Sequence, residues 1–139
     1  MYCTQAQMIE RFGEQLLVQL TDRDGAGIID SAVIDAAIAD ASAEIDMYLA
    51  PRYELPLSTV PLTLTRLACI LARDVLATDS DTHDERWSKQ ADEARRLLRE
   101  IAGGKVSLGV DDQAQEAAGD DTYAAEFKPG RSVFDGGGY

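Results

Sequence analysis

The sequence predicts an all-α protein, a small bundle of about four helices with an extended, partly disordered C-terminal tail. Two observations lead to this prediction. In the first three quarters of the chain, apolar side chains recur at the spacing that is typical of amphipathic helices. From Asp111 onward the chain is polar, acidic and rich in glycine, and it shows no such period. We therefore expect a helical domain at residues 1–109, a flexible acidic linker at 110–126 and a docking segment at 127–139.

The N-terminal part of the chain predicts two short helical segments and a turn. Thr4 can cap a first helix over residues 5–12, and Gly13 is placed to end it. Residues 14–20 can add a turn or two, with their leucines facing inward. The Thr-Asp-Arg-Asp-Gly-Ala-Gly stretch at 21–27 is a turn by composition.

A long helix is expected next, with Ser31 as its cap and its end near Leu49. Wound at about 100° per residue, its apolar side chains fall in one stripe, and Asp35 lies opposite. Pro51 ends this helix and begins an extended connector that runs to residue 60. One side of the connector can lie on the core, because it alternates the apolar residues Tyr53, Leu55 and Leu57.

Two further helices complete the predicted bundle. The segment from Pro61 to about Ala77 is apolar nearly all round, apart from Arg66, Arg73 and Asp74. A helix of this kind belongs in the centre of a bundle or beneath a neighbouring subunit. The segment 84–102 is amphipathic, with one apolar stripe and an outer ladder of charged side chains.

The distribution of charge argues against one class of function and identifies one candidate binding face. Among 139 residues there are 25 acidic and 13 basic side chains, a net charge of -12, which argues against a protein that binds nucleic acid by neutralising phosphates. Residues 86–105 are nevertheless locally basic. Within them Arg95 and Arg99 lie one turn apart, and we expect their face to bind an acidic surface of a neighbouring molecule. A solvated helix face is the alternative.

Asp22, Asp24 and Asp30 follow the spacing of a calcium-binding loop, with acids at loop positions one, three and nine. The pattern is degenerate, because Ala26 and Val33 stand where two further side-chain ligands are needed. It favours a tight turn whose aspartates cap the next helix, and a calcium-gated module is the alternative.

The residue types do not indicate an enzyme. His83 is the only histidine, and no serine or cysteine beside it forms a nucleophile–base pair. Cys69 is expected in the core and Cys3 as a small apolar residue, because two cysteines so far apart do not suggest a disulfide scaffold. We expect no cofactor and no bound metal. We also expect no membrane span, because no apolar run approaches the roughly 20 residues that a bilayer requires.

Aromatic residues return after the acidic linker. The C-terminal stretch is expected to be a docking segment that becomes ordered on a partner, through Phe127, Arg131, Phe134 and Tyr139. A frayed end without function is the alternative.

Short segments along nearly the whole chain also match a known family by their order and spacing. They are Met1-Tyr2 with Thr4, residues 20–25, residues 41–46 with Tyr48-Leu49, Arg52-Tyr53 with residues 55–57, Val60-Pro61, residues 66–69 with Ala72-Arg73, Ile101-Ala102 with residues 104–109, and Pro129-Gly130-Arg131 with Phe134. On these residues the chain resembles the Mu-like family of small phage virion proteins, which are interpreted as head–tail adaptors, or connectors. It departs from the family at Ala26, where relatives often carry aspartate.

The resemblance implies a helical-bundle adaptor that assembles from the cytoplasm of a bacterial host into the head–tail junction of the virion. Copies would form a twelve-fold ring beneath the portal protein, extend the DNA channel and bind the tail or its terminator protein. DNA would be passing cargo, and an acidic channel lining suits this role because it repels phosphates. The competing hypothesis is an acidic regulatory protein, such as a DNA-mimicking inhibitor, which the net charge also fits.

Overall fold

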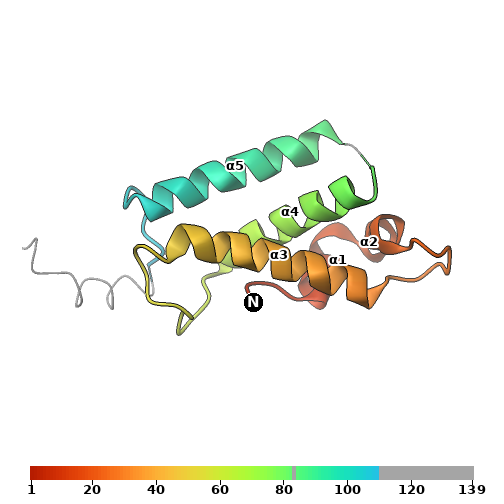
Figure 1. Cartoon of the computed structure of the whole chain (residues 1–139), viewed down its shortest axis with the longest axis horizontal. Coiled ribbons are helices and arrows are strands. Elements are labelled where there is room, and N and C mark those ends of the chain that lie inside the picture. The colour runs from red at the N-terminus through yellow and green to blue at the C-terminus, as the bar shows by residue number, and fades with distance from the viewer. Residues whose placement is uncertain (83, 110–139) are drawn as a thin grey trace, which may run out of the picture.

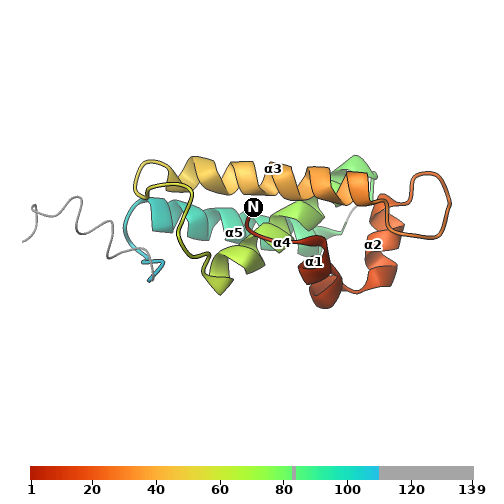
Figure 2. The same cartoon turned by 90° about the horizontal axis from the view of Figure 1, so that it is seen from below.

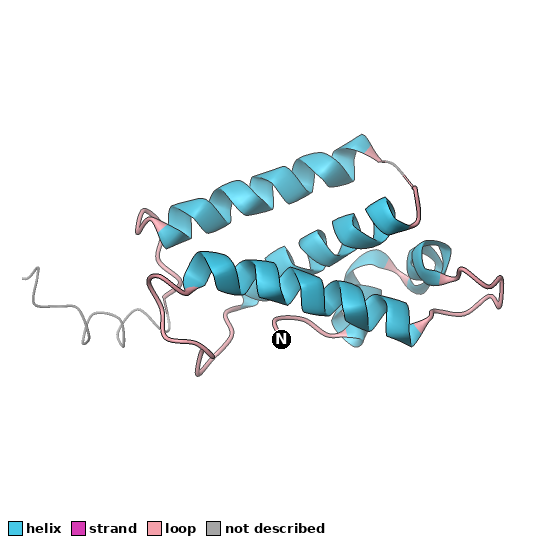
Figure 3. Cartoon of the chain, viewed as in Figure 1, coloured by secondary structure: helices cyan, strands magenta, loops and turns pink. Residues whose placement is uncertain are grey.

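The computed structural model describes residues 1–82 and 84–109, and its regular structure there is entirely helical (Figures 1 and 3). The helices are α1 (Gln5–Phe12), α2 (Glu14–Thr21), α3 (Ser31–Leu49), α4 (Leu62–Asp79) and α5 (Glu85–Ala102). The predicted all-α class is confirmed. The predicted turns at 14–20 form the separate helix α2, so the described residues contain five helices where about four were expected.

The helices α3, α4 and α5 form a three-helix bundle in which successive helices run antiparallel (Figure 1). Each of the three contacts the other two. The short helices α1 and α2 cover the end of the bundle where α3 begins and α4 ends (Figure 2). There α1 packs on α3, and α2 packs on α4. Within residues 1–82 and 84–109, the other helices therefore leave the outer sides of α3 and α5 uncovered along most of their length.

The core is centred on α4. Its apolar side chains Leu64, Leu67, Leu71 and Leu76 are at most 1% exposed, which confirms the central position that its sequence predicted. The two cysteines, far apart in the chain, meet in this core. A hydrogen bond with Cys69, together with burial, raises the pKa of the Cys3 thiol, so Cys3 is neutral at physiological pH.

Helix α1 is capped where the sequence predicted, and the cap of α3 lies one residue earlier than predicted. Thr4 caps α1 through a capping box, because its hydroxyl accepts from the Gln7 amide at 3.2 Å while the Gln7 side chain accepts from the Thr4 amide at 2.9 Å. Gly13 ends α1 with a φ of 91°, a conformation that favours glycine. The cap of α3 is Asp30 and not Ser31, because the Asp30 carboxylate accepts from the amide of Ala32 at 3.1 Å.

The connector between α3 and α4 lies on the core as its alternating pattern predicted. Tyr53 is buried, and Leu55 and Leu57 pack against the core. The Tyr53 hydroxyl also accepts a hydrogen bond from the Leu108 amide at 3.4 Å, which fixes the chain after α5 to the connector. Residues 105–109 contain no strand, and the amide of Lys105 donates a hydrogen bond back to the Glu100 carbonyl at 2.9 Å.

Candidate functional site

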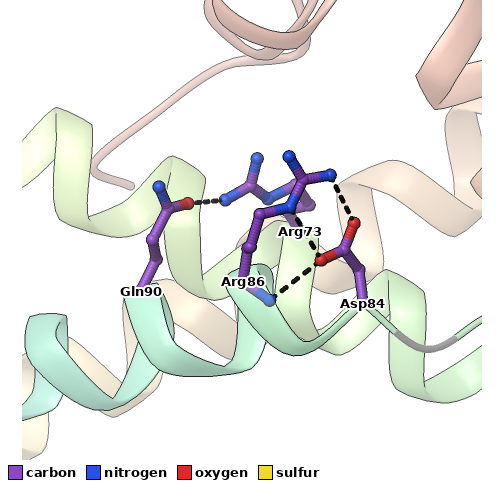
Figure 4. Close-up of polar contacts among 4 residues, drawn as sticks. All are labelled: Arg73, Asp84, Arg86 and Gln90. Carbon is purple, nitrogen blue, oxygen red and sulfur yellow. Dashed lines mark hydrogen bonds and ion pairs between the residues drawn. The ribbon is translucent and has the colours of Figure 1, made fainter.

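A buried arginine joins α1, α4 and α5. Arg73 of α4 is only 7% exposed, although the sequence placed it on a helix edge. Its guanidinium stacks on the ring of Phe12 at 4.4 Å and on the ring of Trp87 at 5.1 Å, and it donates a hydrogen bond to Gln90 (Figure 4). Burial lowers the pKa of Arg73. These contacts make Arg73 a packing element at the junction of three helices.

A second arginine, Arg95, forms ion pairs within its own chain. Arg95 of α5 donates to the Glu44 carboxylate of α3 at 2.6 Å and lies 3.5 Å from the Asp74 carboxylate of α4. These bonds, with Glu44 as the largest cause, raise the pKa of Arg95. Arg95 therefore already has acidic partners in its own chain, and its binding to a neighbouring molecule stays a prediction. Arg99 is exposed, and no side chain of residues 1–82 or 84–109 forms an ion pair with it, so its role in partner binding stays a prediction.

A groove of about 330 Å³ runs between α4 and α5, and we call it the α4–α5 groove. Its floor is apolar, and its rims carry charged side chains from both helices. The lining residues are Arg66, Leu67, Ile70, Lys89, Gln90, Glu93, Ala94, Arg96, Leu97 and Glu100. Sequence reasoning did not single out Arg66 and Lys89 as binding residues. The spacing of Lys89, Glu93 and Arg96 on one face of α5 was a signal that could have indicated such a rim.

The acidic charges of the groove are largely compensated within α5. Arg96 forms ion pairs with Glu93 and, at 3.7 Å, with Glu100. Arg66 and Lys89 have no ion pair in the described part of the chain. The lining of the α4–α5 groove carries three positive and two negative side chains, a net charge of +1 on a protein whose net charge is -12, and the two charged side chains without an ion pair are both positive.

Several large apolar side chains that do not line this groove are exposed. Met1, Met47 and Leu62 are each about three-quarters exposed, at 75%, 76% and 74%. Close to Met1 a second cavity of about 390 Å³ opens between the N-terminus and the connector, and it is lined mainly by apolar residues. Its one charged lining residue, Asp46, accepts a hydrogen bond from the Tyr2 hydroxyl.

The Asp22–Asp30 loop is a tight turn in which Asp22 binds amides of the loop itself, and of its aspartates only Asp30 caps the next helix. The two Asp22 carboxylate oxygens accept hydrogen bonds from the amides of Ala26 at 2.8 Å and Gly27 at 2.6 Å. These amides, Gly27 first, hold the pKa of the Asp22 carboxyl below its ordinary value. Asp30 caps α3. In the described part of the chain, no three acidic, histidine or cysteine side chains converge as a metal site, and Asp24 joins no such group.

We expect calcium to leave the stability of the protein unchanged. The Asp22 oxygens already accept from backbone amides, so an ion would have to displace those bonds and would still lack two side-chain ligands. Thermal melts in chelator and in millimolar calcium should therefore coincide. A melting temperature that rises by many degrees in calcium, and no longer rises in the Asp22→Asn variant, would instead identify a calcium loop.

The predicted C-terminal docking residues Phe127, Arg131, Phe134 and Tyr139 lie outside the described residues, as do the linker 110–126 and His83. The described helices include none that is both long enough and apolar enough to cross a membrane. The fold and its surfaces define a small all-α protein with a charged groove and exposed apolar side chains.

This chain belongs to the Bacteriophage Mu, Gp36 family, whose model matches residues 2–126. It is 33% identical over 112 residues to the Mu-like prophage FluMu protein gp36 of Haemophilus influenzae, covering 81% of this chain and 78% of that protein. It is 34% identical over 130 residues to Gene product J of Escherichia phage Mu, covering 92% of this chain and 91% of that protein. The predicted membership of a Mu-like phage family is confirmed.

Proposed function

We propose that this protein is a structural component of the virion, a head–tail adaptor whose copies form a ring beneath the portal. The ring extends the DNA channel and joins the capsid to the tail. The observation that carries the proposal is the match to a phage Mu family over residues 2–126, because this range includes every described helix of the bundle. The role is one of assembly and not of catalysis.

Two surface properties support an assembly role. Met1, Met47 and Leu62 offer exposed apolar area that a neighbouring molecule can bury. The net charge of -12 suits a wall past which DNA slides, because like charges keep the phosphates from adhering. The same net charge favours a DNA-mimicking inhibitor as a second candidate. Such a protein has no need of exposed apolar side chains, which makes it the weaker candidate.

The two candidates predict different behaviour with portal protein. We expect the purified chain, mixed with a purified portal ring from the same phage, to elute at the mass of the ring plus about one adaptor per portal subunit. Size-exclusion chromatography with light scattering measures this mass. A portal ring from an unrelated tailed phage is the control and should not shift. A chain that elutes at its own mass beside the matching portal would contradict the adaptor function, and binding to a basic host protein would then support the mimic.

A further inference from the structure

The α4–α5 groove has the features of a docking site for a helix. Its floor is formed by apolar side chains, among them Leu67, Ile70 and Leu97, and its rims carry Arg66 on α4 and Lys89 on α5. An apolar floor between charged rims fits an amphipathic helix whose apolar strip lies along the floor. Arg66 and Lys89, the two rim charges without an ion pair in the described part of the chain, are positive and lie on different helices, so we expect the occupant to carry a carboxylate on each side of its apolar strip.

The outer face of α3 has the complementary pattern. A strip of small or flexible apolar residues on this face is exposed, namely Ala32, Ala36, Ala39, Ala43 and Met47. Asp35 lies along one edge of the strip and Asp40 along the other, and both are exposed. Because alanine side chains are short, this face can approach the floor of a groove closely, with a carboxylate towards each rim.

The two surfaces lie on opposite sides of one bundle. The flank of α5 that carries Arg95 faces α3, where Arg95 binds Glu44. Leu97 and Gln90, on another flank of α5, line the groove. The buried side of α3 contacts both α4 and α5, so the outer face of α3 is directed away from the groove (Figures 1 and 2). One chain therefore cannot fill its own groove with its own α3.

We propose that the outer face of α3 of one copy occupies the α4–α5 groove of the next copy. This interface joins two different surfaces of identical chains, and repetition of such a contact generates a ring when the rotation closes. Asp35 and Asp40 then lie against Arg66 and Lys89 of the neighbour. The inference rests on the proposed function, in which copies of the chain form a ring, and it names the two surfaces that join them.

A charge exchange in the full-length chain tests this interface. The variant Arg66→Glu with Lys89→Glu makes the groove rims acidic, and the variant Asp35→Lys with Asp40→Lys makes the α3 edges basic. Each variant alone sets like charges against each other at every interface, so we expect its self-association, measured by sedimentation velocity, to weaken at least about tenfold. Mixed in equal amounts, the two variants should recover oligomers, because every interface in an alternating ring again pairs opposite charges.

Native mass spectrometry distinguishes the two variants by mass and should find equal numbers of each in the recovered oligomers. The matched controls Arg23→Glu with Lys105→Glu, and Asp24→Lys with Asp79→Lys, change exposed charges elsewhere and should associate like the wild type. Circular dichroism melts confirm that each variant folds. The interface is contradicted if either charge-reversal variant self-associates as strongly as the wild type. It is also contradicted if the mixture of the two variants does not form oligomers. A wild-type chain that stays monomeric up to its solubility limit would also overturn the interface. The adaptor function is tested separately, and it fails if the chain does not bind the portal.

Discussion

Replacing Arg73 with alanine is expected to lower the free energy of unfolding by about 3 kcal/mol. The guanidinium fills the space between Phe12 of α1 and Trp87 of α5, and truncation leaves both rings facing a cavity. It also leaves the Gln90 side chain without its donor. Urea denaturation followed by circular dichroism measures the loss.

Arg73→Met separates packing from charge. Methionine keeps most of the volume and contacts aromatic rings favourably. It also removes a buried charge whose Nε has no hydrogen-bond partner among the described residues. We therefore expect Arg73→Met to stay within about 1 kcal/mol of the wild type. Arg66→Ala, an exposed arginine on the same helix, is the matched control and should change stability by less than about 0.5 kcal/mol. A methionine variant as unstable as the alanine variant would show that the charge, and not packing, holds the three helices together.

Deleting the chain after Gly109 is expected to weaken portal binding about a hundredfold without changing the melting curve. The deleted part carries Phe127, Phe134 and Tyr139, and burial of such rings on a partner contributes several kcal/mol before the cost of ordering the segment is subtracted. The described helices and the core that they enclose lie within residues 1–109, so we expect the stability of the bundle to persist. Titration of fluorescently labelled portal measures the affinity, and a phage complementation assay measures head–tail joining.

The full-length variant in which Phe127, Phe134 and Tyr139 are all replaced by serine should reproduce the loss, because it removes the rings and keeps the length and acidity of the linker. Replacement of Asp111 and Asp112 by asparagine is the control for the linker and should bind the portal like the wild type. If the truncated protein binds the portal and complements a defective phage as well as the full chain does, residues 127–139 are a frayed end without function.

The helices could be predicted because their signals are local. Thr4, Gly13 and Pro61 mark helix boundaries through their own backbone and side-chain chemistry, and the structure places boundaries at all three. The cap of α3 was misplaced by one residue, since Asp30 and Ser31 are both good capping residues. Only the geometry of the loop decides between them.

The surfaces could not be predicted in the same way, because they depend on which helices meet. The sequence shows that Arg95 lies on a charged flank of its helix, but it does not show that Glu44, 51 residues earlier, is opposite. In the same way Arg66 looked like an isolated charge on an apolar helix. The packing of α5 beside α4 makes it one rim of a groove whose other rim carries Lys89.

The opposition of the α3 outer face and the α4–α5 groove has a consequence for symmetry. In a ring, each copy is turned from the next by a full rotation divided by the number of copies, which is about 30° for twelve. If these two surfaces join the copies, that turn equals the angle by which the two surfaces depart from being diametrically opposite within one bundle. The angle is set by how α3 lies on α4, and thus by buried residues such as Ile38 and Ile45. The number of copies in the ring would then be determined by the packing of the core, and a change of one methyl group far from any interface could alter it.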